Sequence, residues 1–220
     1  MKELIKGVIF DLDGVLVSTD EMHFMAWKRL AKELDIKNFT KEDNKLQKGV
    51  SRMESLEVVL RKGSKLYSEE EKVELATRKN NYYIDLLQGL TSEAVLKDVI
   101  PTLEMLRERN VAIAVGSASK NALIILEKTG LSKYIDEVSC GLDTSKSKPD
   151  PEVFIIAAKK INLAHEECLV VEDSLAGIVA AKAAKMKTLG VGPEYKQLGA
   201  DYESLTLQSQ VDWNEILNQG

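Results

Sequence analysis

Short apolar runs that end at polar residues recur along the chain and predict the strands of a sheet. Five of them have strand length and β-branched character: Gly7 to Phe10, Val111 to Val115, Glu137 to Cys140, Cys168 to Val171 and Lys187 to Val191. Runs of consecutive apolar residues are typical of strands that are buried on both faces of a parallel sheet. The pattern therefore predicts a central parallel sheet.

Helical patterns separate most of these runs. They cover Pro101 to Arg109, Lys120 to Thr129, Val153 to Ile161 and Ser174 to Ala184. Gly130 suits a helix end, and Asp150-Pro151 suits a helix start with the aspartate as cap and the proline in the first position. Strands that alternate with helices in this way predict a doubly wound, Rossmann-like α/β fold.

The alternation breaks between about Asp20 and Leu90, where no strand pattern occurs. Aromatic and apolar residues from His23 to Leu34 follow helical spacing, and further helical patterns cover 55–60 and 68–87. An all-helical insertion directly after the first strand can lie over the carboxyl edge of the sheet. We predict a core of residues 1–16 and 91–220 and a helical cap domain of residues 17–90, with hinges near its two ends.

Polar groups that suit phosphoryl chemistry follow four of the predicted strands: Asp11 with Asp13, Ser117, Lys148 and Glu172-Asp173. Because the carboxyl ends of parallel strands converge on one crevice, we expect these groups to lie together. Carboxylates and a backbone carbonyl are ligands that Mg²⁺ prefers. One aspartate can attack phosphorus, and Asp13 can act as general acid and base. The lysine and the serine hydroxyl can offset charge on the phosphoryl oxygens.

Each of these groups alone also has a structural explanation. Two aspartates at a strand end often form a turn, and Ser119 after Ser117 can cap a helix. An isolated lysine is usually solvated, and acids such as Glu172-Asp173 suit the positive end of a helix. Four such signals in one order favour a shared site over four separate explanations.

Together, Asp11-Leu12-Asp13-Gly14, Ser117, Lys148 and Glu172-Asp173 resemble the motifs of the haloacid dehalogenase-like superfamily of phosphotransferases. The resemblance covers roughly the whole chain. It implies that Asp11 is the nucleophile and Asp13 the general acid and base. It also implies a Mg²⁺ site formed by Asp11, a backbone carbonyl at Asp13, Glu172 and Asp173.

The insertion is similar to that of the β-phosphoglucomutase subgroup in the segments 19–28, 48–55 and 78–80, as is the core segment 117–121. This resemblance implies interconversion of β-glucose 1-phosphate and glucose 6-phosphate through bound glucose 1,6-bisphosphate. It implies that Arg52 holds the distal phosphate. The implied catalytic residues are Asp11, Asp13, Thr19, His23, Ser117 and Lys148. The implied substrate contacts are Trp27, Lys48, Gly49, Val50, Ser51, Arg52, Ser55, Lys79, Ser119, Lys120 and Asn121.

Several cap residues also have a structural explanation. His23 and Trp27 fit the apolar core of a helical cap, and Lys79 fits a charged helix face. Ser51 forms a capping box with Glu54, whatever else it contacts. Two further positions, Ser18 and Gly116, depart from the pattern, which commonly has an acid and an alanine there.

Charge and composition narrow the function further. Lys and Arg number 30 against 35 Asp and Glu, for a formal charge of −5, and no basic tract suggests nucleic-acid binding. No apolar run reaches membrane-spanning length, the N-terminus lacks a signal-peptide core, and Cys140 and Cys168 suit core positions. We expect a cytoplasmic monomer that acts on a small sugar phosphate.

Two competing hypotheses share this scaffold. A phosphatase acting on sugar phosphates or other small esters would use the same core chemistry, with water as the acceptor. A non-catalytic binding protein is disfavoured, because every catalytic position of the pattern is intact. Fold and core motifs alone do not decide between a mutase and a phosphatase.

Overall fold

The sheet is parallel and doubly wound, as predicted. The structure is a computed structural model that describes residues 4–217. Within these residues the strand order is β3-β2-β1-β4-β5-β6. The strands are β1 (Gly7–Phe10), β2 (Ala112–Gly116), β3 (Glu137–Ser139), β4 (Cys168–Glu172), β5 (Lys187–Gly190) and β6 (Tyr202–Glu203). Because β1 lies between β2 and β4, its carboxyl end opens at the centre of the sheet edge.

Helices cover both faces of the sheet because side chains alternate along each strand. Val8 and Phe10 pack in one apolar cluster with residues of α5 and α6, whereas Ile9 packs on the other face with residues of α7 and α8. These helices are α5 (Val99–Glu108), α6 (Ala122–Thr129), α7 (Glu152–Lys160) and α8 (Leu175–Ala183). A short α9 (Trp213–Leu217) joins the first cluster.

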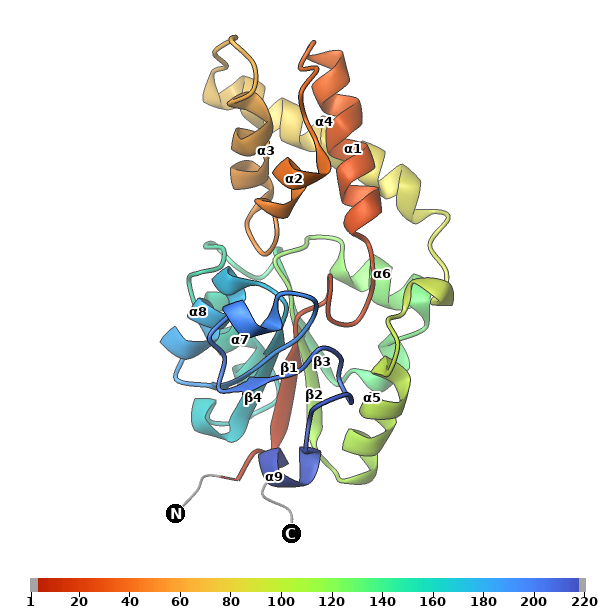
Figure 1. Cartoon of the computed structure of the whole chain (residues 1–220), viewed down its shortest axis with the longest axis vertical. Helices are drawn as coiled ribbons and strands as arrows, with labels where there is room; N and C mark the ends of the chain where they lie inside the picture. The colour runs from red at the N-terminus through yellow and green to blue at the C-terminus, as the bar shows by residue number, and fades with distance from the viewer. Residues whose placement is uncertain (1–3, 218–220) are drawn as a thin grey trace.

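Four helices follow β1 and form a second body above the carboxyl edge of the sheet (Figure 1). They are α1 (Asp20–Glu33), α2 (Lys41–Lys45), α3 (Arg52–Leu60) and α4 (Glu69–Leu87). This body has its own apolar core, to which Trp27, Leu30 and Leu56 contribute. We call it the cap.

The two chain crossings between cap and core lie side by side. Ser18 N–H donates to Ala94 O at 2.8 Å, and Leu96 N–H donates to Leu16 O at 3.0 Å. The incoming and outgoing segments are therefore hydrogen-bonded to each other. Such paired crossings suit a hinge about which the cap can rotate as a unit.

Several element boundaries differ from the predictions. The helix predicted from Lys120 begins at Ala122, because Asn121 N–H is already bonded to the Ser119 hydroxyl. The helix predicted after Asp150 begins at Glu152, whose N–H is bonded to the Asp150 carboxylate. Four 3₁₀ turns, Ser92–Ala94, Ser132–Tyr134, His165–Glu167 and Tyr195–Gln197, complete the elements assigned within residues 4–217. No helix in that range combines the length and apolar character needed to cross a bilayer.

Candidate active site

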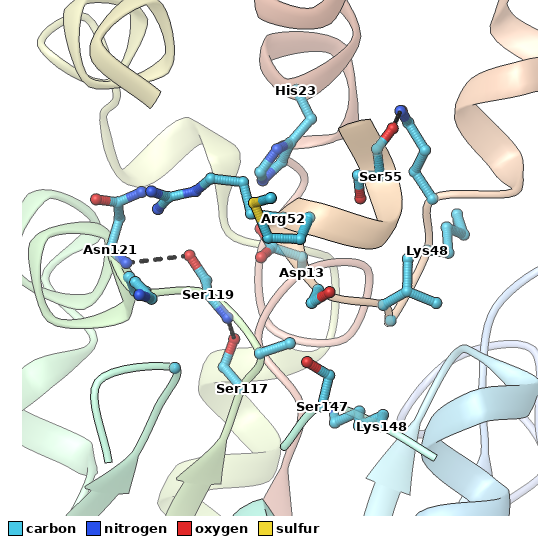
Figure 2. A pocket seen from close by; sticks show the side chains of 18 of the residues that line it. Asp13, His23, Lys48, Arg52, Ser55, Ser117, Ser119, Asn121, Ser147 and Lys148 are labelled. Atoms are coloured by element: carbon cyan, nitrogen blue, oxygen red, sulfur yellow. Dashed lines mark hydrogen bonds between the residues drawn. The ribbon is translucent and has the colours of Figure 1, made fainter. Parts of the chain in front are cut away.

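A cavity of about 530 Å³ lies between the cap and the carboxyl edge of the sheet. Both bodies supply its walls, and Figure 2 shows side chains from each pointing toward the space between them. Every predicted site residue except Thr19 and Glu172 lines this cavity. The strand-end groups and the cap groups therefore share one site.

The loop after β1 places two carboxylates at the floor of the cavity. Asp11 N–H is bonded to Val171 O at 2.9 Å, so the loop continues directly from the sheet. Gly14 then turns the chain with φ of 87°, and a Cβ at this position would collide with the Asp173 carboxylate. Glycine is thus required for the turn and for the close approach of Asp173 to this loop.

Lys148 is buried between two carboxylates. Its Nζ lies 2.5 Å from Asp11 Oδ1 and 2.6 Å from Glu172 Oε1, and its side chain is 0% exposed. The ring of Phe154 lies beneath it, 4.7 Å from Nζ. A Cβ at Gly116 would come within 2.7 Å of that ring, so glycine makes room for Phe154 where the pattern commonly has alanine.

Glu172 is buried and does not line the cavity. Besides Lys148, its carboxylate accepts from the N–H and the hydroxyl of Ser174, both at 2.8 Å. Gly177 leaves the space that this side chain occupies. Glu172 therefore holds Lys148 in place, while Asp11, Asp13 and Asp173 present carboxylates to the cavity.

The acids on the cavity floor suit a divalent cation. Burial raises the pKa of Asp11 well above its usual range against the opposing effect of Lys148, and it raises the pKa of Asp173 to about 6 with the help of nearby Glu172. A cation placed among them would relieve this cost, and an all-oxygen donor set is what Mg²⁺ prefers. Within residues 4–217 no three His, Cys, Asp or Glu side chains form a group ready to hold a metal ion. Asp11 instead contacts Lys148, and Asp173 contacts Lys48.

Asp13 is held by the start of the cap. The Thr19 hydroxyl donates to Asp13 Oδ1, although Thr19 itself does not line the cavity. Burial raises the pKa of Asp13 to about 6 despite this hydrogen bond. A carboxyl group with a pKa near neutrality can both accept and donate a proton, as a general acid and base must.

A stacked cluster of cap side chains lies above Asp13. The rings of His23 and Tyr83 are stacked 3.9 Å apart, and Lys79 Nζ lies 2.9 Å from His23 Nδ1. Burial lowers the pKa of His23 well below its usual range, and burial together with Arg52 lowers the pKa of Lys79 to about 7. His23 is therefore neutral. Trp27 lies 4.6 Å beneath Lys79 and also belongs to the cap core, as the structural explanation expected.

Arg52 is a cation of the cap that lines the cavity. Burial alone lowers its pKa, and within residues 4–217 no neighbouring acid opposes that shift. Figure 2 shows it between the cap and the core loop that carries Ser117, Ser119 and Asn121. A half-buried, unpaired guanidinium in a cavity is suited to bind an anion through its planar fork.

The cap loop before α3 rests directly on the core. Lys48 Nζ lies 2.9 Å from Asp173 Oδ2 and 3.5 Å from Asp20 Oδ2. A Cβ at Gly49 would come within 2.5 Å of the Ser174 hydroxyl, so this contact requires glycine. Ser51 caps α3 and forms the expected capping box with Glu54. Val50, Ser55 and Lys120 complete the predicted lining.

Sequence reasoning did not single out Asp20, Gln47, Asn80 or Tyr83, although all four line the cavity. Asp20 and Asn80 lie in the segments 19–28 and 78–80 that resemble the subgroup, but the resemblance implies no role for either. Tyr83 fits the apolar stripe of α4 and therefore gives no sign of lying in the site. Only the packing of the cap on the core brings these residues to the cavity.

Replacing Asp13 by asparagine is expected to stabilise the protein above pH 6 while reducing turnover. An acid whose pKa is raised by folding favours the native state at low pH and loses that contribution as pH rises through about 6. Asparagine carries no charge, so the variant should exceed the wild type by about 1–2 kcal/mol at neutral pH. That gain should disappear as pH falls toward the ordinary carboxyl range.

Urea unfolding without Mg²⁺, at about pH 7.5 and about pH 5, measures this difference in the free energy of unfolding. The lowered pKa values of His23 and Lys79 affect both proteins and largely cancel. Turnover of the variant should fall by about 10²–10⁴-fold. An equal stability difference at both pH values would contradict a buried, charged Asp13.

Comparison with known proteins agrees with this geometry. The model of the haloacid dehalogenase-like hydrolase family matches residues 8–191. A β-phosphoglucomutase of Bacillus subtilis is 40% identical over 199 residues, covering 90% of this chain and 88% of the relative. A phosphorylated carbohydrates phosphatase of Thermotoga maritima is 29% identical over 188 residues, covering 84% of each chain.

Solved structures give the same result. The crystal structure of β-phosphoglucomutase from Clostridium difficile is 37% identical, with a TM-score of 0.90 over 98% of this chain and 96% of that one. The match spans the core and the cap together, so the inserted helical cap is shared. The chain belongs to the haloacid dehalogenase-like hydrolase family, in its β-phosphoglucomutase subgroup.

Proposed function

We propose that the protein is a β-phosphoglucomutase, which interconverts β-D-glucose 1-phosphate and D-glucose 6-phosphate. The observation that carries this proposal is Arg52, which the cap places in the cavity that Asp11 also lines and which has no acidic partner within residues 4–217. A phosphomutase needs a second anion site because its intermediate carries two phosphates. The mutases of Bacillus subtilis and Clostridium difficile among its relatives support the same activity.

In the proposed reaction, Asp11 carries the phosphoryl group as an aspartyl-phosphate. The C6 hydroxyl of β-glucose 1-phosphate attacks that phosphorus, Asp13 takes the hydroxyl proton, and the bond to Asp11 breaks to give β-glucose 1,6-bisphosphate. After the bisphosphate turns around, Asp11 attacks the phosphoryl group at C1. Asp13 returns the proton to the C1 oxygen, and glucose 6-phosphate leaves.

The remaining groups of the core stabilise the transferring phosphoryl group. Lys148 and the Ser117 hydroxyl can donate to its oxygens, and Ser117 is oriented by the N–H of Ser119 at 3.1 Å. Asp11, Asp173 and the main-chain carbonyl of Asp13 would hold Mg²⁺, which supplies charge neutralisation at the phosphoryl oxygens when bound. With both oxygens engaged, Glu172 acts on this site through Lys148.

The cap gives the proposed mutase its preference for sugar over water. His23 and Lys79 lie beside Asp13 only because α1 and α4 pack together above it. Binding of the distal phosphate by Arg52 favours closure, which excludes water from the aspartyl-phosphate. One chain supplies all of these groups, so we propose that it works as a monomer.

Two assays run side by side test the proposal. The first is a coupled assay that measures glucose 6-phosphate formed from β-glucose 1-phosphate, with Mg²⁺ and catalytic glucose 1,6-bisphosphate present. The second measures inorganic phosphate. Glucose 6-phosphate without phosphate release supports the mutase. Phosphate release without glucose 6-phosphate would contradict it and favour a sugar phosphatase, the activity named for the Thermotoga maritima relative.

Replacing Arg52 by alanine should separate the two activities. We expect mutase turnover to fall by about 10²-fold or more, because a charge-assisted bidentate contact to the distal phosphate is lost. Hydrolysis of p-nitrophenyl phosphate, which has no distal phosphate, should change little. Arg61→Ala is the matched control, since Arg61 is exposed at the end of the same helix. Equal losses in both reactions would assign Arg52 to the core chemistry instead.

A further inference from the structure

A hydrogen bond joins cap and core at the wall of the cavity. The Asn121 side-chain N–H donates to Asn80 Oδ1 at 3.0 Å. Asn80 belongs to α4 of the cap, and Asn121 immediately precedes α6 of the core. Both residues line the cavity, and they are 41 positions apart in sequence. This contact exists only while the cap rests on the core.

The core fixes the backbone of Asn121 but not its amide. Its N–H is bonded to the Ser119 hydroxyl at 3.2 Å, and the N–H of Ser119 is bonded to the Ser117 hydroxyl at 3.1 Å. Figure 2 shows these three residues in one row along the cavity. Within residues 4–217, no side chain of the core forms a hydrogen bond with the side-chain amide of Asn121. That orientation comes from Asn80.

The donors of the Asn121 side-chain amide determine how this hydrogen bond is made. An asparagine NH₂ has two N–H donors, and the Asn80 carbonyl oxygen accepts one of them. The second donor remains for another acceptor, and Asn121 is 7% exposed, so little water competes. Arg52 and Lys120 line the same cavity and favour an anionic oxygen as that acceptor. A freely rotating amide would as readily present its own oxygen, which repels an anion.

We propose that Asn80 is a positioning residue that turns the Asn121 amide so that its second N–H faces the distal phosphate of the substrate. Closure of the cap then completes the anion site, and phosphate recognition is coupled to closure. The inference rests on the proposed function, because it assigns the second anion to a phosphate on a sugar. Asn80 touches neither the reacting atoms nor the phosphate in this scheme.

A double-mutant cycle over Asn80→Ala and Asn121→Ala tests the coupling, with KM and kcat for β-glucose 1-phosphate as readouts. We expect Asn80→Ala to raise KM about fivefold, the effect of one hydrogen bond, with a smaller change in kcat. In the Asn121→Ala background the same substitution should change KM less than twofold. Asn81→Ala, an exposed neighbour on α4, is the control and should leave both constants unchanged.

Other outcomes are equally informative. Equal effects of Asn80→Ala in both backgrounds would overturn the proposal and make Asn80 a general contact between cap and core. A larger rise in KM for p-nitrophenyl phosphate than for β-glucose 1-phosphate would also overturn it, because p-nitrophenyl phosphate has no distal phosphate. If the wild type hydrolyses sugar phosphates instead of isomerising them, the proposed function fails. The cycle is then measured on the KM for hydrolysis of glucose 1,6-bisphosphate, which places one phosphate at Asp11 and one at the distal site, so the coupling is tested independently.

Discussion

Asp11→Asn is expected to abolish both mutase turnover and phosphoenzyme formation. An amide does not attack phosphorus as a carboxylate does, and no other carboxylate on the cavity floor is linked to Lys148 in the same way. The loss should be about 10⁴-fold or more, as when a nucleophile is removed from other enzymes with covalent intermediates. The coupled glucose 6-phosphate assay measures turnover, and intact mass after acid quenching detects the phosphoenzyme.

The variant should remain folded, which separates lost chemistry from lost structure. Burial and the nearby acids Glu172, Asp173 and Asp13 raise the pKa of Asp11, so a neutral amide removes an unfavourable charge. Lys148 keeps its contact with Glu172 at 2.6 Å. Cooperative melting of Asp11→Asn and unchanged turnover of the exposed control Asp85→Asn are the expected results. Residual turnover above about one per cent would show that Asp11 is not the nucleophile.

Strands buried on both faces were predictable because they consist of runs of consecutive apolar residues. β1 was predicted at its observed bounds, and β3, β4 and β5 were predicted at their observed starts. β6 has two residues and α2 has five, which is too short for either period to appear. The edge strand β6 was therefore missed, whereas the opposite edge strand β3 was predicted.

The residues of the candidate site likewise divide into those that could be predicted from the sequence and those that could not. Asp11, Ser117 and Asp173 were predictable because parallel topology brings strand ends together. Lys148 lies in the loop between β3 and α7, and the loop carries it to the same edge. The location of Asn80 and Tyr83 depends on how two helical bodies pack, and no local spacing encodes that. Glu172 shows a further limit, because only the structure reveals that Lys148 and Ser174 occupy its oxygens.

Gly116, where the family pattern commonly has alanine, illustrates why such a departure is hard to interpret from sequence. Gly116 ends β2, and the ring of Phe154 fills the space that a methyl group would take. The same ring lies 4.7 Å from Lys148 Nζ. The residue at the end of β2 is thus matched to a side chain of α7, 38 positions later in the chain, which also contacts Lys148.

Lys148→Met is expected to cause the largest loss of stability of any substitution at the cavity. Removing one partner from a buried ion pair leaves the others without compensation, which costs about 3–5 kcal/mol. Here a single ammonium serves both Asp11 and Glu172, and all three side chains are at most 10% exposed. Urea unfolding measures the loss. Lys6→Met, which breaks an equally short but more exposed contact with Glu167, should cost about 1 kcal/mol or less.

The dependence of this stability loss on pH, on Mg²⁺ and on the Asp11→Asn background distinguishes an electrostatic loss from a packing defect. The pKa of Asp11, already raised by burial, should rise further without Lys148, so the deficit should shrink as pH falls from about 8 to about 5. Mg²⁺ should also shrink it, by supplying positive charge to the same acids. In an Asp11→Asn background, Lys148→Met should cost less, because one uncompensated carboxylate is gone. A deficit that stayed constant across pH, Mg²⁺ and background would mean that Lys148 contributes packing alone.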